Sequence, residues 1–207
     1  MRRRLSLCAA AVFGIASCSS DPAPFETAEL DDEIDETLDA ALADGEDFAE
    51  VECPIDDIAE VLDAVFGGVD SDLVDNALSG EPDQFASLGT DLDAGFIDCS
   101  VGAFDGNEFV GIYLLEAPSD VDAFLEEFAT EDADVDIEVG EMLGGGQLRQ
   151  ACADFDGEDD DYCEVNWAND DVFIGAYVLG DGAIDIDPAD FEDAFVAQLD
   201  VIIAQFT

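Results

Sequence analysis

Phe109-Val110-Gly111-Ile112-Tyr113-Leu114-Leu115 decides the fold, because it is almost wholly apolar and returns later in the chain. Phe173-Ile174-Gly175-Ala176-Tyr177-Val178-Leu179 matches it at a spacing of 64 residues, with Gly and Tyr at equivalent positions. A strand that is apolar on both faces is normally covered on both sides of its sheet. The two stretches therefore predict two central strands of one sheet.

The similarity extends towards the N-terminus without a gap. Cys99-Ser-Val101-Gly-Ala103 matches Cys163-Glu-Val165-Asn-Trp167, and each block predicts a hairpin with the apolar strand that follows it. A helical pattern follows each hairpin, with Phe124 and Phe128 in the first copy and Phe191 and Phe195 in the second. We infer a tandem duplication of a helix-plus-strands unit.

Other patterns complete the fold class. Helices are predicted from Pro54 to Phe66, after the cap Ser119, and from Pro188 behind the cap Asp187. Strands are predicted over residues 134–143 and 147–155. The expected class is α+β: an antiparallel sheet with helices packed on one face, built from two tandem repeats, with a closing C-terminal helix.

Two local details of the predicted strands bear on function. Gly111 and Gly175 sit inside strands, where glycine weakens pairing, so we expect a β-bulge at each or, as the alternative, a group packed closely over it. On the strand from Tyr162, the residues Glu164 and Asn166 alternate with apolar neighbours. That alternation predicts that both polar side chains face solvent.

The N-terminus reads as an export signal. Arg2 to Arg4 precede a short apolar run that ends in Ile15-Ala16-Ser17-Cys18. This ending is similar to a lipobox, which implies cleavage before Cys18 and attachment of acyl chains to its sulfur. We expect a signal peptide over 1–17, an acidic tether over 18–52 and a folded domain over 53–207. The alternative is an ordinary cleaved signal with a chance cysteine.

Within that tether, Leu30, Ile34, Leu38 and Leu42 recur every four residues and predict a helix. The segment has no lysine to pair with its acidic residues. It is either a stalk that is helical in high salt or a helix that docks on the domain, and the pattern favours neither.

The charge balance restricts partners and environment. Removal of residues 1–17 leaves Arg149 as the one basic residue against 55 acidic ones, a formal charge of −54. Mutual repulsion is largely screened in molar salt, so this composition, with 49% hydrophobic residues, indicates adaptation to high salt. Nucleic acid and anionic headgroups would be repelled. The lipid anchor, cations and basic protein surfaces remain as partners.

Of the six cysteines, Cys8 lies in the expected signal peptide and Cys18 is the expected lipidation site. The other four suit an oxidising compartment. They allow three pairings, and we favour Cys53 with Cys99 and Cys152 with Cys163. The first pair would tie a helix to a strand. The second would link adjacent strands across a short acidic turn.

The lipobox, the acidic tether, Cys53-Pro54-Ile55 and Cys99-Ser-Val101 together resemble small actinobacterial lipoproteins of unknown function. More loosely, the pattern is similar to the extracellular sensor domains of mycobacterial receptor Ser/Thr kinases. The resemblance implies a disulfide-stapled α+β domain that binds an unidentified ligand in a cleft. The expected location is the extracytoplasmic face of the cell membrane.

Most catalytic arrangements are missing. Without His or Lys the chain has no Ser-His-Asp triad and no P-loop, so we expect a non-catalytic protein. The function predicted is binding of a ligand or protein partner. A structural or cation-binding envelope component is the alternative, and a carboxylate-dependent hydrolase is the third candidate.

Two groups of residues are candidate sites. Arg149 is predicted to receive an anionic ligand group in a cleft between the repeats, lined by Tyr113, Tyr177 and Trp167, or else to form a structural salt bridge. An acidic turn offers oxygen ligands of the kind that Ca²⁺ prefers, with a solvated acidic turn as the alternative. The turn residues concerned are Asp154, Asp156, Glu158 and Asp160.

Overall fold

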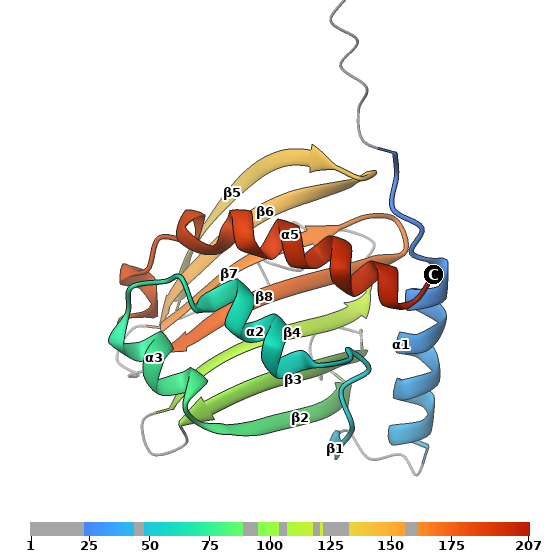
Figure 1. The fold of residues 1–207 in the computed structure, drawn as a ribbon, viewed down its shortest axis with the longest axis horizontal. Coiled ribbons are helices and arrows are strands. Elements are labelled where there is room, and N and C mark those ends of the chain that lie inside the picture. Colours follow the sequence, from blue (N-terminus) through green and yellow to red (C-terminus); the bar gives the residue numbers. More distant parts are fainter. Residues whose placement is uncertain are drawn as a thin grey trace, which may run out of the picture.

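One antiparallel sheet of eight strands organises the computed structural model of the chain, in the order β1-β2-β3-β4-β8-β7-β6-β5 (Figure 1). The structure describes residues 23–43, 48–88, 95–103, 107–117, 121, 133–155 and 161–207. The strands are β1 (Phe48–Glu50), β2 (Glu81–Leu88), β3 (Gly95–Ala103), β4 (Glu108–Glu116), β5 (Ala133–Leu143), β6 (Gly146–Phe155), β7 (Asp161–Ala168) and β8 (Val172–Gly180).

The two predicted central strands lie in the middle of the sheet. β4 pairs with β8 without interruption from Phe109 opposite Leu179 to Glu116 opposite Val172. Most of their residues are buried on both faces, which confirms the prediction of doubly covered strands. Ile112 pairs with Ala176, its equivalent in the second sequence repeat. The duplication itself stays a prediction.

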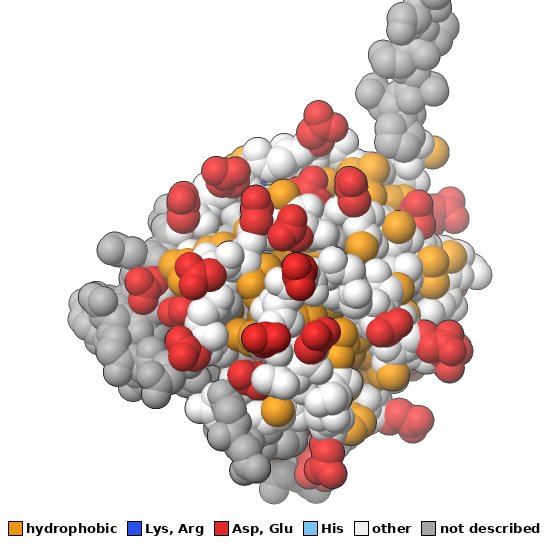
Figure 2. Space-filling view, turned by 60° about the vertical axis from the view of Figure 1, so that its left-hand side comes forward, with side chains coloured by type: hydrophobic (Ala, Val, Ile, Leu, Met, Phe, Trp, Pro, Cys, Tyr) orange, Lys and Arg blue, Asp and Glu red, His pale blue; other side chains and the backbone are white. Residues whose placement is uncertain are grey.

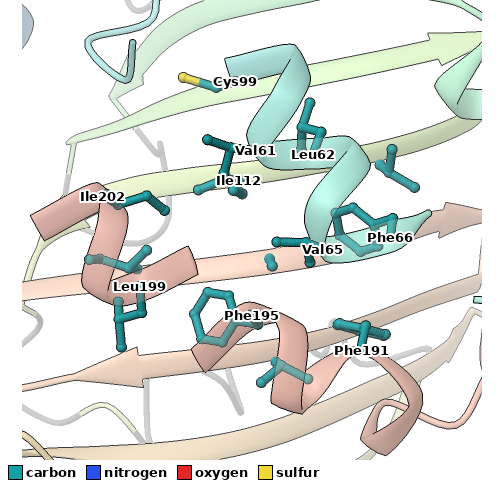
Figure 3. Close-up of a cluster of buried hydrophobic side chains, with 14 of the residues drawn as sticks. Val61, Leu62, Val65, Phe66, Cys99, Ile112, Phe191, Phe195, Leu199 and Ile202 are labelled. Carbon is teal, nitrogen blue, oxygen red and sulfur yellow. The ribbon is translucent and has the colours of Figure 1, made fainter. Parts of the chain in front are cut away.

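The helices that the structure describes in full pack against one face of this sheet, as predicted. They are α1 (Ala28–Ala41), α2 (Ile58–Phe66), α3 (Asp72–Leu78) and α5 (Ala189–Gln205), with a 3-10 helix η1 at Ala183–Asp185. The main core forms where α2 and α5 meet over the central strands (Figure 3). The rings of Phe66 and Phe191 lie 5.3 Å apart there. The expected α+β class with a C-terminal helix is confirmed.

Two parts of the fold differ from the sequence prediction. α2 begins at Ile58 instead of Pro54, since Asp57 adopts a left-handed conformation with φ 53° that interrupts the helix. The elements β1, β2, α3 and η1 were not predicted. β2 contains Pro82, which a paired strand tolerates poorly. β1 pairs only with Phe85 to Ser87, so Pro82 lies beyond the part of β2 that β1 covers.

α1 docks on the domain, which decides between the two arrangements that the sequence left open. Leu30 and Ile34 are fully buried in the main core. The pKa of Glu116 is raised, chiefly by a hydrogen bond with Asp35 of α1, with burial and nearby carboxylates adding to it. Apolar burial therefore holds the helix against repulsion between acidic groups, and the folded unit includes part of the predicted tether.

The chain is also held to the sheet just before α1. The Phe25 N–H donates to the Gly144 carbonyl at 2.7 Å, and its ring lies 5.4 Å from the ring of Trp167 in an edge-on arrangement. These contacts attach residue 25 to the turn between β5 and β6. Only a short length of chain separates this contact from Cys18.

The predicted disulfide pairing is confirmed. Cys53 is bonded to Cys99, and Cys152 is bonded to Cys163. Cys152 and Cys163 are directly opposite each other on β6 and β7, as the sequence predicted.

Several predicted features lie outside the described residues. These are the signal peptide over 1–17, Cys18, and the helix after Ser119 with Phe124 and Phe128. Among the described helices, none is long and apolar enough to span a bilayer.

Candidate functional site

All three tyrosines of the chain meet on the sheet face opposite α2 and α5. The Tyr113 and Tyr177 ring centroids are 6.1 Å apart, and Tyr162 stacks on Tyr177 at 5.6 Å. Two carboxylates and an amide complete a group that we call the tyrosine–carboxylate cluster. Its members are Tyr113, Tyr162, Tyr177, Asp98, Glu164 and Asn166.

The two strand glycines make room for this cluster. Tyr113 is paired with Gly175, and Tyr177 with Gly111, in a ladder that is continuous at both places. A Cβ atom added to Gly175 would lie 2.3 Å from the Tyr113 ring, and one added to Gly111 would lie 2.6 Å from the Tyr177 ring. The favoured prediction of β-bulges is therefore wrong, and each tyrosine packs over the glycine of the neighbouring strand.

Glu164 accepts three hydrogen bonds inside the cluster. The hydroxyls of Tyr113 and Tyr162 donate to Oε2, and the Asn166 amide donates to Oε1 at 2.6 Å. Burial raises the pKa of Glu164, while the three donors oppose that effect. The expectation that Glu164 and Asn166 face solvent is wrong, because they are 1% and 0% exposed.

Asp98 is the second buried carboxyl group of the cluster and is 5% exposed. Its Oδ2 accepts a hydrogen bond from the Tyr177 hydroxyl at 2.8 Å. Burial raises the pKa of Asp98 to about 6, against the lowering effect of the Ser100 and Tyr177 hydroxyls. Within the described part of the chain, Asp98 Oδ1 and Asn166 Oδ1 have no hydrogen-bond partner.

A carboxyl group with a raised pKa is a common general acid in enzymes. Such an acid must reach a substrate, and in a glycosidase it needs a second carboxylate across an accessible site. Asp98 and Glu164 instead lie inside the packed face, with almost no exposed surface. Their arrangement suits a structural network better than carboxylate-dependent hydrolysis.

The residues predicted to line a cleft do not come together. Tyr113 and Tyr177 belong to the tyrosine–carboxylate cluster, whereas Trp167 is fully buried in the core on the helix side. The Trp167 indole donates to the Leu143 carbonyl at 2.8 Å. Arg149 lies half-buried on β6, where its Nη1 donates to the Gln147 carbonyl at 3.5 Å.

An open groove lies elsewhere, on the helix side of the sheet near the β5 edge. It encloses about 470 Å³ between β5, β6, η1 and the start of α5. We call it the acidic groove, because four of the nine described residues that line it are carboxylates and none of these nine is basic. The lining residues are Asp136, Glu138, Gln150, Ala151, Cys152, Asp154, Ile184, Asp187 and Pro188.

The groove carboxylates come from distant parts of the sequence. Asp136 and Glu138 point to the helix side because they pair with Cys152 and Gln150 of β6. Asp187 precedes α5 and accepts a hydrogen bond from the Ala189 N–H at 3.0 Å. Of the four, Asp154 is one of the predicted calcium ligands and Asp187 is the predicted helix cap. Asp136 and Glu138 are not singled out by the sequence, because the pairing that brings them here has no local pattern.

The predicted calcium ligands are only partly described. Asp154 lines the acidic groove, while Asp156, Glu158 and Asp160 lie outside the described residues. Among the described residues, no three His, Cys, Asp or Glu side chains form a group that could hold a metal ion. The groove carboxylates are therefore spread along a surface rather than gathered around a point.

Comparison with protein-family models, curated proteins and solved structures finds no match to this chain.

Close packing of tyrosine over glycine predicts the effect of adding one methyl group. Gly175→Ala and Gly111→Ala should each lower the unfolding free energy by about 1–3 kcal/mol, as overpacking does. Gly68→Ala is the matched control, because no atom lies within 4 Å of its added Cβ. Thermal unfolding of the three variants checks this, and equal melting temperatures would show that the rings move aside freely.

The pKa of Asp98 predicts how stability changes with pH. A folded-state pKa of about 6, above the ordinary 3.8, means that the protonated form is favoured by folding. This contribution is complete below about pH 4 and disappears as the pH rises through 6. The unfolding free energy of the native protein should therefore fall by about 3 kcal/mol relative to Asp98→Asn between pH 4 and pH 7.

Denaturant unfolding across that pH range measures the difference, with Asp200→Asn on the exposed surface of α5 as the control. The control should follow the native curve. If the unfolding free energy of Asp98→Asn changes with pH in the same way as that of the native protein, Asp98 ionises in the folded protein without loss of stability.

Proposed function

We propose that this protein is a non-catalytic, lipid-anchored protein on the extracytoplasmic face of the cell membrane, adapted to high salt, that binds a cationic ligand or basic protein surface in the acidic groove. The observation that carries the proposal is the groove itself. It is open, it holds about 470 Å³, and its described lining has four carboxylates and no basic residue.

Cations are the favoured ligands on electrostatic grounds. In molar salt the screening length is only about 3 Å, so attraction acts through direct contact and not over a distance. A groove that surrounds a cationic group with carboxylates supplies such contacts. The spacing of these carboxylates suits an extended cation with several charges better than a single metal ion.

The anchor would orient the groove. Five residues lead from Cys18 to Ala23, and a chain of that length reaches at most about 18 Å. Since Phe25 is bonded at the β5–β6 turn, lipid on Cys18 would keep that turn near the membrane. Glu138 lies six residues before Gly144, which is about 20 Å of strand. The groove would then lie at the end of β5 that is farther from the bilayer.

A structural, cation-buffering role is the second candidate. Acidic side chains are scattered over the described surface in Figure 2, and none of the described side chains on that face is coloured as Lys or Arg. Such a surface would bind counterions wherever carboxylates lie. The two proposed functions differ in one expected result. Only specific binding in the groove predicts that removal of the groove carboxylates weakens cation binding more than removal of carboxylates elsewhere.

Lipid attachment is tested by Cys18→Ser in the native host. The native protein should remain with the membrane fraction and carry a diacylglyceryl group on Cys18, because two acyl chains give durable anchoring. The variant should be released or retained as an uncleaved precursor. Mass spectrometry of the purified protein checks the modification, and an unmodified Cys18 in the mature native chain would contradict the anchor.

Groove binding is tested with spermidine, a linear cation with three charges. Asp136→Asn combined with Glu138→Gln should weaken spermidine binding about tenfold, the equivalent of about 1.4 kcal/mol. The matched control, Asp39→Asn combined with Asp200→Asn, removes the same charge from exposed helix positions. Calorimetric titration in KCl, from dilute to molar concentration, checks both, and an equal loss in the two variants would favour the buffering role.

A further inference from the structure

The outer edge of β5 is an unpaired strand beside the acidic groove. β5 is last in the sheet order, and within the described part of the chain it pairs only with β6. Its residues from Glu138 to Met142 are exposed. Val139 and Met142 are 61% and 64% exposed, the largest values among the exposed large apolar side chains that the structure describes. An exposed edge presents free backbone N–H and C=O groups that can pair with another chain.

This edge is protected against a second copy of itself. A shift in register between Val139 and Met142 forms a bulge, which interrupts the regular pleat of this strand before pairing with β6 resumes at Met142. Asp136 and Glu138 lie on the straight part before the bulge. Two such edges brought together would place carboxylates next to carboxylates, and like charges on neighbouring strands destabilise pairing. A basic segment would meet no such repulsion.

The alternation of β5 specifies the pattern of a segment that could pair with it. Asp136 and Glu138 face the groove, while Ile137 and Val139 face the opposite side of the sheet. Same-side residues of a strand are about 6.8 Å apart, and an added strand would lie about 4.8 Å away. Basic residues at every second position would therefore stand beside the groove carboxylates, and the residues between them would stand beside Val139.

From this arrangement we infer that β5 binds an extended segment of a partner protein, in which Lys or Arg alternates with apolar residues, as an added strand along residues 136–139. The inference rests on the proposed function of the groove and identifies its ligand. Main-chain hydrogen bonds and apolar contact with Val139 are little affected by salt. Binding by strand addition therefore suits molar salt, where only charges in direct contact contribute to affinity.

The test uses the full chain in molar KCl and a synthetic peptide of four Lys-Val repeats. Two control peptides have the same composition and charge: one with four lysines followed by four valines, and one N-methylated at every residue, which removes the N–H donors. The alternating peptide should bind at least tenfold more tightly than either control. Its binding should protect amides of β5 from hydrogen exchange.

Variants connect the peptide to the groove. Asp136→Asn combined with Glu138→Gln should weaken binding of the alternating peptide about tenfold, and Asp39→Asn combined with Asp200→Asn should leave it unchanged.

Three outcomes separate this inference from the proposed function. If the three peptides bind equally and spermidine competes for the groove, strand addition is overturned while groove binding stands. If neither spermidine nor any peptide depends on the groove carboxylates, both fail. If β5 amides are already protected in the free protein and the chain is dimeric, a second copy occupies the edge and the inference is overturned.

Discussion

The pairing of β4 with β8 is the interaction on which the rest of the structure depends. One face of these strands carries the core under α2 and α5, and the other carries the tyrosine–carboxylate cluster. Both faces require the same register, because Tyr113 must lie over Gly175 and Tyr177 over Gly111. A shift by one residue would exchange the two faces and place tyrosine rings in the helix core.

The second constraint is a chain with almost no cations to neutralise its acids. Inside the protein, the buried carboxyl groups Asp98 and Glu164 are met by tyrosine hydroxyls and an amide instead of by Lys or Arg. Outside, neutralisation is left to ions of the solvent. Two disulfides and a core of aromatic and aliphatic side chains supply cohesion that does not depend on charge. The same surplus of carboxylates lines the acidic groove, where we propose that cations bind.

Features with strong local patterns could be predicted from the sequence. The central strands, α5 and the linked strands at Cys152 and Cys163 all follow from apolar runs, capping residues or short spacing. Glu164 and Asn166 could not be placed in this way, since a polar residue between apolar ones normally faces water. The signal was available in another form: every tyrosine of the chain lies in or beside the repeated strands. Three hydroxyl groups near one face provide donors for a buried carboxylate.

Periodicity and composition by themselves determined the α+β class, the two central strands, the disulfides and the excess of negative charge, because each depends on neighbouring residues or on counts. Only the tertiary structure decided that α1 joins the core, that the strand glycines lie beneath tyrosine rings, and that Asp136, Asp154 and Asp187 share a groove. These depend on which strands become neighbours and in what register. That choice is set by packing across the whole sheet, so no local stretch of sequence carries it.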